Sequence, residues 1–306
     1  MLTELFTYGG LFIISLIVLL KGSDWFVDSA EEIGLSLGIS PFLIGVTIVA
    51  FGTSLPELAA SVASVLAGES KIVVANVVGS NITNIALVLG ITTLVAKEIK
   101  LEYNIWHVDM PYLWGSAFLL WLVLLDLKVS VAECILFLGG IIIFLAYSFK
   151  QSEKGGDRPK ASLKSYGLFV LGGIFVWVGA EYTIQAITNL SNVIGIGTEV
   201  IALTAIALGT SLPEVIVSIN AARKGKTSIA VGNVLGSNMF NTYVVMAIPG
   251  LLGNLEIPPQ ILEVSLPLMV VMTVIFGMVS NNKNITRWEG VLLLLFYAFF
   301  LVESFK

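Results

Sequence analysis

The sequence predicts an all-α integral membrane protein with ten transmembrane helices, arranged as two inverted-topology repeats of five. Three observations support this fold class: an apolar composition, a biased distribution of basic residues, and a similarity between the two halves of the chain. Hydrophobic residues make up 57% of the 306 residues and charged residues only 12%, whereas about 25% of the residues of an ordinary soluble domain are charged. A soluble domain of this size could not bury so much apolar surface.

Long apolar runs, such as residues 5–20 and 135–147, contain almost no charge. A membrane span needs roughly 20 apolar residues, and lipid requires its backbone polar groups to be hydrogen-bonded internally, so these runs are expected to be helices. The first run follows Glu4 and no basic segment, so we expect a permanent span and not a cleaved signal peptide. The ten expected spans are residues 5–30, 41–67, 72–96, 108–126, 131–149, 165–190, 199–222, 228–253, 261–280 and 287–304.

The basic residues favour one orientation of these spans. With the N-terminus outside, thirteen of the 16 Lys and Arg residues lie on the cytoplasmic side, and only Lys71, Lys128 and Lys306 lie outside. Basic residues are enriched in the cytoplasmic loops of membrane proteins. We therefore expect a multi-pass protein of the cell membrane with both termini extracellular and the charged linker, residues 150–164, in the cytoplasm.

The two halves of the chain resemble each other at a shift of 157 residues. The shift aligns Gly-Thr-Ser-Leu-Pro-Glu at 52–57 with the same six residues at 209–214, and 20 of 50 positions are identical between 41–90 and 198–247. Such internal similarity indicates a duplication. Residues 1–149 would form the first five-helix repeat and residues 165–306 the second, together making one transmembrane domain. Because five is odd, the second repeat would enter the membrane from the opposite side, an arrangement typical of secondary transporters.

Glu57 and Glu214 end the two hexapeptides and are expected near the middle of the second and seventh spans. A charged carboxylate at the bilayer centre costs at least ~2.5 kcal/mol, so it needs a proton, a partner or a bound cation. No Lys or Arg is expected at that depth. A protonated glutamate that hydrogen-bonds within the bundle is the alternative, but two symmetry-related carboxylates favour a shared cation site.

Pro56 and Pro213 precede these glutamates. Proline lacks an N–H and clashes with the carbonyl four residues back, so the helices should open near residues 50–54 and 207–211. The freed carbonyls would lie beside Thr and Ser hydroxyls, and such oxygen ligands suit hard cations. Simple helix packing at a Gly/Pro kink is the alternative.

Polar residues of the third and eighth spans also match in the repeat. Ser80 and Asn84 share one helical face, as do Ser237 and Asn241. We expect these four side chains to coordinate the cation. For Asn76, Asn81, Asn233 and Asn238 we expect hydrogen bonds between helices.

Asp24 and Glu181 are paired by the repeat as well. A structural role is favoured for both, and a role around the ion site or in the sliding of helices is the alternative. The sequence contains no Cys/His metal cluster, no phosphate-binding Gly-Lys-Ser/Thr loop and no nucleophile–base–acid triad. A nucleotide-driven pump is therefore not expected, and we expect a protein that is not an enzyme.

These hexapeptides and the Gly-Ser-Asn segments that follow them resemble the two α-repeats of the calcium/cation antiporter superfamily, in its sodium/calcium exchanger branch. The resemblance covers almost the whole chain, which looks like a minimal prokaryotic or archaeal member. It implies an antiporter that exchanges Ca²⁺ for Na⁺ by alternating access, electrogenically at three Na⁺ per Ca²⁺. The first and sixth spans would slide as a gating pair.

The resemblance also implies a set of ligands. Glu57 and Glu214 would hold Ca²⁺ together with the backbone oxygens of Thr53 and Thr210. The Na⁺ sites would share both glutamates with further residues, and two asparagines would line the central position. The complete expected set is Glu57, Glu214, Thr53, Thr210, Ser54, Ser211, Ala50, Ala207, Ser80, Ser237, Asn84 and Asn241.

Sodium is the expected coupling ion, because proton-coupled relatives tend to carry a Gly-Asn motif before the glutamate. Potassium-dependent relatives have Asp at the position of Asn241, where this chain has an amide. An H⁺/Ca²⁺ antiporter of the same fold and a cation channel are the alternatives, and inverted repeats argue against a channel. The expected ligands are Ca²⁺ and Na⁺, with H⁺ competing at the glutamates and no organic cofactor. We expect the protein to lie in a lipid bilayer, to bind no nucleic acid and to function as a monomer.

Overall fold

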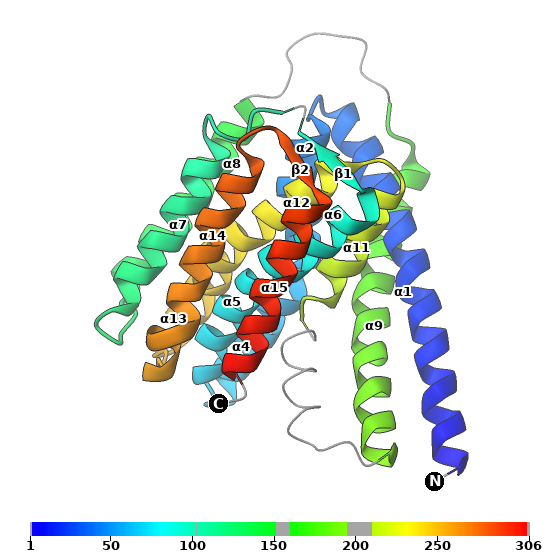
Figure 1. Ribbon diagram of the computed structural model, residues 1–306, viewed down its shortest axis with the longest axis horizontal. Coiled ribbons are helices and arrows are strands. Elements are labelled where there is room, and N and C mark those ends of the chain that lie inside the picture. Colours follow the sequence, from blue (N-terminus) through cyan, green and yellow to red (C-terminus); the bar gives the residue numbers. More distant parts are fainter. Residues whose placement is uncertain (1, 102, 151–159, 195–209, 305–306) are drawn as a thin grey trace.

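The computed structural model describes residues 2–101, 103–150, 160–194 and 210–304. The described chain is a bundle of helices with one small sheet (Figure 1). The first half contains α1 (Leu2–Ser36), α2 (Pro41–Ile44), η1 (Gly45–Val49), α3 (Ala50–Thr53), α4 (Leu55–Leu66), α5 (Lys71–Thr83), η2 (Asn84–Leu89), α6 (Gly90–Ala96), α7 (Asp109–Leu124) and α8 (Val131–Lys150), where η marks a π-helical segment. The second half contains α9 (Leu163–Ile194), α11 (Leu212–Arg223), α12 (Thr227–Phe240), η3 (Asn241–Val245), α13 (Ala247–Leu252), η4 (Ile261–Ser265), α14 (Leu266–Ser280) and α15 (Arg287–Ser304).

Six helical stretches are long and apolar enough to cross a membrane, which confirms the prediction of a multi-pass all-α protein. They are Thr3–Ser36, Pro41–Leu66, Lys71–Ala96, Val131–Lys150, Leu163–Leu190 and Ile261–Ser280. The shorter helix Asp109–Leu124 is also apolar. Ten spans in an inverted repeat remain a prediction, as do the boundaries of the two repeats and the linker. Part of the expected seventh span, with Ala207, lies outside the described residues.

The two longest helices, α1 and α9, form an antiparallel pair at one edge of the bundle (Figure 1). Their glycines allow close packing, since a Cβ on Gly22 would lie 2.6 Å from the Cβ of Phe175 and one on Gly179 would lie 2.7 Å from the backbone nitrogen of Leu19. Aromatic rings stack along the same contact, for example Phe26 on Phe169 with centroids 4.9 Å apart. This extensive packing should make α1 and α9 move as one unit.

The centre of the bundle is built from α5 with η2 and α12 with η3. Every residue of α12 from Ile229 to Phe240 is buried, including its polar residues. A helix that is buried on all sides is typical of the core of a large protein. The polar residues of α5 and α12 are therefore held deep inside the molecule, where the site described below is found.

A two-stranded antiparallel ladder joins the two halves of the chain. In it, β1 (Glu98–Lys100) pairs with β2 (Asn284–Thr286), with Ile99 opposite Ile285. Both isoleucines are fully buried, and the Asn284 side chain donates a hydrogen bond of 2.7 Å to Glu98. The sequence analysis did not predict these strands, because three residues are too few to show the alternation typical of a strand.

Both chain termini lie at one end of the bundle in Figure 1. We call the opposite end, where α1 and α8 finish and α9 begins, the linker end. There the backbone N–H of Ser162 donates a hydrogen bond of 2.9 Å to Glu32 near the end of α1.

Candidate functional site

Each hexapeptide forms a break just before a helix. The first break lies at Ser54, which has φ −89° and ψ 3° and separates α3 from α4. The second lies at Ser211, which has φ −87° and ψ 3° before α11. Pro56 and Pro213 occupy the first turns of α4 and α11, where a missing N–H costs nothing. The predicted opening is confirmed at both serines, and residues 207–209 lie outside the described part of the chain.

The breaks place Glu57 and Glu214 in the first turns of α4 and α11, with side chains that are almost completely buried. The N-terminal end of a helix favours a negative charge. The Ser54 hydroxyl donates a hydrogen bond of 3.0 Å to Oε1 of Glu214, so the first hexapeptide contacts the glutamate of the second. The two carboxyl groups are also close enough for their charges to interact. The structure thus brings the two motifs into one buried site.

Two crossed hydrogen bonds extend the contact between the halves. The Thr53 hydroxyl donates to Oδ1 of Asn233 at 3.1 Å, and its repeat counterpart Thr210 donates to Oδ1 of Asn76 at 3.1 Å. Both threonine hydroxyls thus reach an asparagine of the opposite half, and the Thr53 hydroxyl also lies within hydrogen-bond distance of the Ala50 carbonyl of its own half. The family resemblance implies that these threonines bind a cation through their backbone carbonyl oxygens, which these hydroxyl contacts do not involve.

Both asparagines are held by a serine of their own half. Asn76 donates to Ser61 and Asn233 donates to Ser218, each at 3.0 Å. Asn76 also donates to the backbone carbonyl of Glu57 at 3.3 Å. The expected role of these asparagines in hydrogen bonding between helices is confirmed. Ser61 and Ser218 are not among the predicted site residues, although the repeat aligns them.

The remaining repeat-related asparagines behave less symmetrically. Asn81 donates to the Thr242 hydroxyl at 3.0 Å, which joins the halves, whereas Asn238 donates to the Val234 carbonyl of its own helix at 2.9 Å. The expected bonding between helices therefore holds for Asn81, and the prediction for Asn238 is wrong, because its amide reaches the preceding turn of α12.

Several buried oxygen and nitrogen atoms near the glutamates have no hydrogen-bond partner among the described residues. Asn84 and Asn241 leave both side-chain polar atoms unpaired, and Ser211 and Ser237 leave their hydroxyls unpaired. Both carboxylate oxygens of Glu57 and Oε2 of Glu214 are unpaired too. These residues lie on elements that contact one another, since α11 packs against η2 and α4 packs against η3. Buried polar groups are nearly always hydrogen-bonded, so this many unpaired atoms on contacting elements are characteristic of a ligand site.

Asn84 and Asn241 are the first residues of the π-helical segments η2 and η3. A π-helical turn inserts an extra residue into the helix and is frequent at functional sites. These segments could not be predicted, because their composition is that of any apolar helix. Each segment begins at one of the two repeat-related buried asparagines. This feature of the site is visible only in the structure.

Ser80 and Ala50 are placed differently from the unpaired residues. The Ser80 hydroxyl lies 3.4 Å from the Thr210 hydroxyl and 3.4 Å from Oδ1 of Asn76. The Ala50 carbonyl accepts bonds from the Thr53 hydroxyl at 3.3 Å and the Ser54 N–H at 3.0 Å. Both residues are buried at the edge of the site, while Ala207 lies outside the described residues.

Asp24 and Glu181 lie apart from these residues. Asp24 forms an ion pair with Lys224 at 2.9 Å, and Glu181 is exposed. Among the described residues, no group of three or more His, Cys, Asp or Glu could hold a metal ion. The candidate site therefore contains two carboxylates surrounded by neutral hydroxyl and amide groups, a donor set that suits a hard cation such as Na⁺ or Ca²⁺.

Comparisons with known proteins agree with this chemistry. The family model described as sodium/calcium exchanger protein matches residues 7–150 and 164–306. The sodium/calcium exchanger MaX1 of Methanosarcina acetivorans is 33% identical over 96% of this chain and 97% of its own length. The inner membrane protein YrbG of Escherichia coli is 31% identical over 93% of this chain and 92% of its own length.

A solved structure of the sodium-calcium exchanger NCX_Mj has the same fold. It superimposes with a TM-score of 0.86 at 31% sequence identity and covers 97% of this chain and 99% of its own. The residues that the family model matches extend over both halves of this chain and include positions 52–57 and 209–214. The chain therefore belongs to the sodium/calcium exchanger protein family.

Proposed function

We propose that the chain is a secondary antiporter that exchanges Ca²⁺ for Na⁺ across a membrane by alternating access. The observation that carries this proposal is the meeting of Glu57 and Glu214, one from each half, in a buried site with many unpaired oxygen atoms. Membership of the family supports cation exchange, and relatives such as MaX1 and NCX_Mj are named for sodium and calcium.

The proposed ligands are the two glutamates with the surrounding oxygens of the set expected from the sequence. Two ionised glutamates give the site a charge of −2, and charge imbalance is costly in a low-dielectric interior. One Ca²⁺ or two Na⁺ would balance this charge. A third Na⁺ would leave a net charge of +1 and make exchange at three Na⁺ per Ca²⁺ electrogenic.

We also propose ten spans in two inverted repeats, with both termini outside and the linker in the cytoplasm. The described helices begin and end close to the expected spans, and the two termini lie at the same end of the bundle (Figure 1). The protein would act as a monomer in the cell membrane and would catalyse no chemical reaction.

Transport into proteoliposomes tests the proposed function. The purified protein is reconstituted in vesicles loaded with Na⁺, and uptake of radioactive Ca²⁺ is measured after dilution into a Na⁺-free medium. Parallel vesicles carry a K⁺ gradient or a proton gradient instead. We expect uptake with the Na⁺ gradient alone, and uptake driven only by the proton gradient would contradict sodium coupling.

Exchange of Ca²⁺ for protons is the second candidate function. Among the described residues, no Lys or Arg forms an ion pair or hydrogen bond with Glu57 or Glu214, so a proton could neutralise either carboxylate in place of Na⁺. The proton-gradient vesicles measure this route directly.

A further inference from the structure

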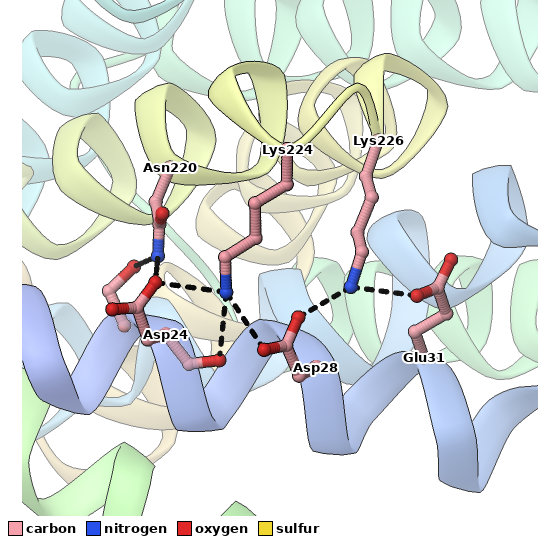
Figure 2. Close-up of polar contacts among 7 residues, drawn as sticks. Asp24, Asp28, Glu31, Asn220, Lys224 and Lys226 are labelled. Carbon is pink, nitrogen blue, oxygen red and sulfur yellow. Dashed lines mark hydrogen bonds and ion pairs between the residues drawn. The ribbon is translucent and has the colours of Figure 1, made fainter.

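Away from the ion site, a network of charges joins α1 to the turn between α11 and α12 (Figure 2). Nζ of Lys224 lies 2.9 Å from Asp24 and 2.8 Å from Asp28. Nζ of Lys226 lies 2.6 Å from Asp28 and 2.8 Å from Glu31. Asp28 is shared by both lysines, so the four ion pairs form one continuous network.

The local structure explains why the charges meet. Asp24, Asp28 and Glu31 are four and three residues apart and share one face of α1. On the other side, Gly225 adopts φ +78°, a conformation that glycine favours. The resulting tight turn directs Lys224 and Lys226 toward the same helix, as Figure 2 shows.

The lysine side of the network is partly shielded from water, whereas the side chain of Asp28 is 54% exposed. The side chains of Lys224 and Lys226 are only 26% and 19% exposed. Burial tends to lower the pKa of Lys226, but hydrogen bonds to Asp28 and Glu31 outweigh it and raise that pKa, so the ammonium stays charged. Isolated surface pairs contribute little to stability, whereas shared networks contribute more.

A neutral contact lies on the side of the network that faces the ion site. Asn220 donates hydrogen bonds of 3.0 Å to both Asp24 and Ser23. Asn220 belongs to α11, the helix whose first turn carries Glu214. Ten residues separate Glu214 from Lys224, about 15 Å along a helix. The network therefore ties α1, and with it α9, to the helix that holds half of the ion site.

The internal repeat shows that this connection is present on one side only. Gly68, the counterpart of Gly225, has φ +84°, so the two turns have similar backbones. Yet the shift of 157 residues places Ala67 opposite Lys224 and Glu69 opposite Lys226. The counterpart of Asp24 is Glu181, which would meet alanine and a like charge in place of two lysines.

The packing of the helices follows the same asymmetry. Among the described residues α1 packs along α11, whereas its partner α9 makes few contacts with α4, the counterpart of α11. No ion pair reaches Glu181 within the described part of the chain. Within the described ranges, the ion pairs that join the α1–α9 pair to the rest of the bundle therefore lie at the linker end.

We propose that the network of Asp24, Asp28, Glu31, Lys224 and Lys226 is a one-sided latch, which keeps the linker end of the α1–α9 pair closed against α11. Ion access from the linker end requires the latch to open, while access from the opposite end does not. The latch therefore biases the protein toward the conformation that opens at the terminal end. The inference rests on the proposed alternating access.

Distance measurements between spin labels test the latch without any transport. In a Cys134→Ala background, labels are attached through Leu37→Cys at the end of α1 and Asn282→Cys in the turn before β2, both at exposed positions. Lys224→Met with Lys226→Met removes both lysines of the latch. We expect the population with the longer distance to increase roughly fivefold or more, the lower end of typical conformational coupling.

Arg223→Gln is the matched control, because it removes one positive charge from the same turn without touching the network. Arg223 is exposed, and its substitution should leave the distance distribution unchanged. A double lysine variant with the distribution of the Arg223→Gln control would overturn the proposal.

A charge exchange distinguishes loss of the ion pair from misfolding of the variant. Asp24→Lys alone should open the linker end, and Asp24→Lys combined with Lys224→Asp should restore most of the closed population. Failure of the combined variant to restore it would also overturn the latch. Because the labels report distances in the absence of exchange, a failure of the proposed function appears only in the vesicle assay and is distinguishable from a failure of the latch.

Discussion

The two glutamates of the site are equivalent in sequence but not in their contacts. Glu214 accepts a hydrogen bond from Ser54, whereas both carboxylate oxygens of Glu57 lack a donor among the described residues. The hydroxyl of Ser211, the counterpart of Ser54, has no hydrogen-bond partner in the part of the chain that the structure describes. A site built from a duplicated motif is therefore asymmetric at the level of single atoms, and the two carboxylates need not bind a cation in the same way.

Replacing either glutamate by its amide should abolish exchange. Glu57→Gln and Glu214→Gln each reduce the charge of the site from −2 to −1, which no longer balances Ca²⁺. The measurement is Na⁺-driven uptake of radioactive Ca²⁺ into proteoliposomes. Glu256→Gln is the matched control, since Glu256 forms an exposed ion pair with Lys71. Normal uptake by either site variant would exclude that glutamate as a ligand.

Asn241→Asp should change which monovalent ions support transport. A third carboxylate in the buried position of Asn241 would give the site a charge of −3, so one more monovalent cation is needed with Ca²⁺ to restore neutrality. We expect Ca²⁺ uptake by this variant to increase when K⁺ is added, which is measured in the same vesicles. Unchanged dependence on Na⁺ and K⁺ would place Asn241 outside the ion path.

At the scale of elements, α12 depends on a backbone approach that only glycine permits. A Cβ on Gly236 would lie 2.7 Å from the Cβ of Ala50 and closer still to the Val46 carbonyl. Gly236 is next to Ser237, so this contact between η1 and α12 also sets the position of a site residue. The glycine of the Gly-Ser-Asn segment is therefore required for packing as well as for the site.

Gly236→Ala should destabilise the protein, since overpacking a tight contact costs about 1–3 kcal/mol. The readout is the Tm of the detergent-solubilised protein, followed by intrinsic fluorescence. Gly139→Ala, in α8, is the control, because a Cβ there meets no atom within 4 Å among the described residues. Equal Tm values for the two variants would contradict the close packing of η1 on α12.

The helices and their breaks could be predicted from the sequence, whereas the π-helical segments and the contacts between the halves could not. Apolar runs predicted the helices, and Pro56 and Pro213 predicted the breaks that the structure shows at Ser54 and Ser211. The repeat predicted that Glu57 and Glu214 meet. The π-helical segments could not be predicted, because a shift of backbone hydrogen bonds leaves no trace in composition. The crossed Thr53–Asn233 and Thr210–Asn76 bonds depend on how the two halves are placed in space.

At the scale of the whole molecule, the basic residues serve two purposes that the sequence does not distinguish. The sequence analysis counted Lys224 and Lys226 only as part of the cytoplasmic excess of positive charge. The structure shows that both are bound to carboxylates of α1, whereas Lys160 and Lys164 are exposed at the linker end. The proposed orientation in the membrane and the proposed closure of the linker end would thus involve the same residues.

The proposed orientation predicts which positions a membrane-impermeant reagent reaches. In a Cys134→Ala background, Thr3→Cys should react with an impermeant maleimide on intact cells, because we expect the N-terminus outside. Lys160→Cys should react only after the membrane is permeabilised. Labelling is read as a mass shift on a gel, and the reverse pattern would invert the proposed topology.

The ladder between β1 and β2 has a consequence for how the chain could be divided. It fastens a loop of one half to a loop of the other, and the crossed Thr–Asn bonds join the halves again in the interior. Two separate polypeptides, residues 1–155 and 156–306, should therefore find each other when they are co-expressed, and together they should recover Na⁺-driven Ca²⁺ uptake. Either polypeptide alone contains only one of the two site glutamates, Glu57 or Glu214, and should transport nothing. Recovery of uptake by the two fragments would show that the halves assemble without a covalent connection between them.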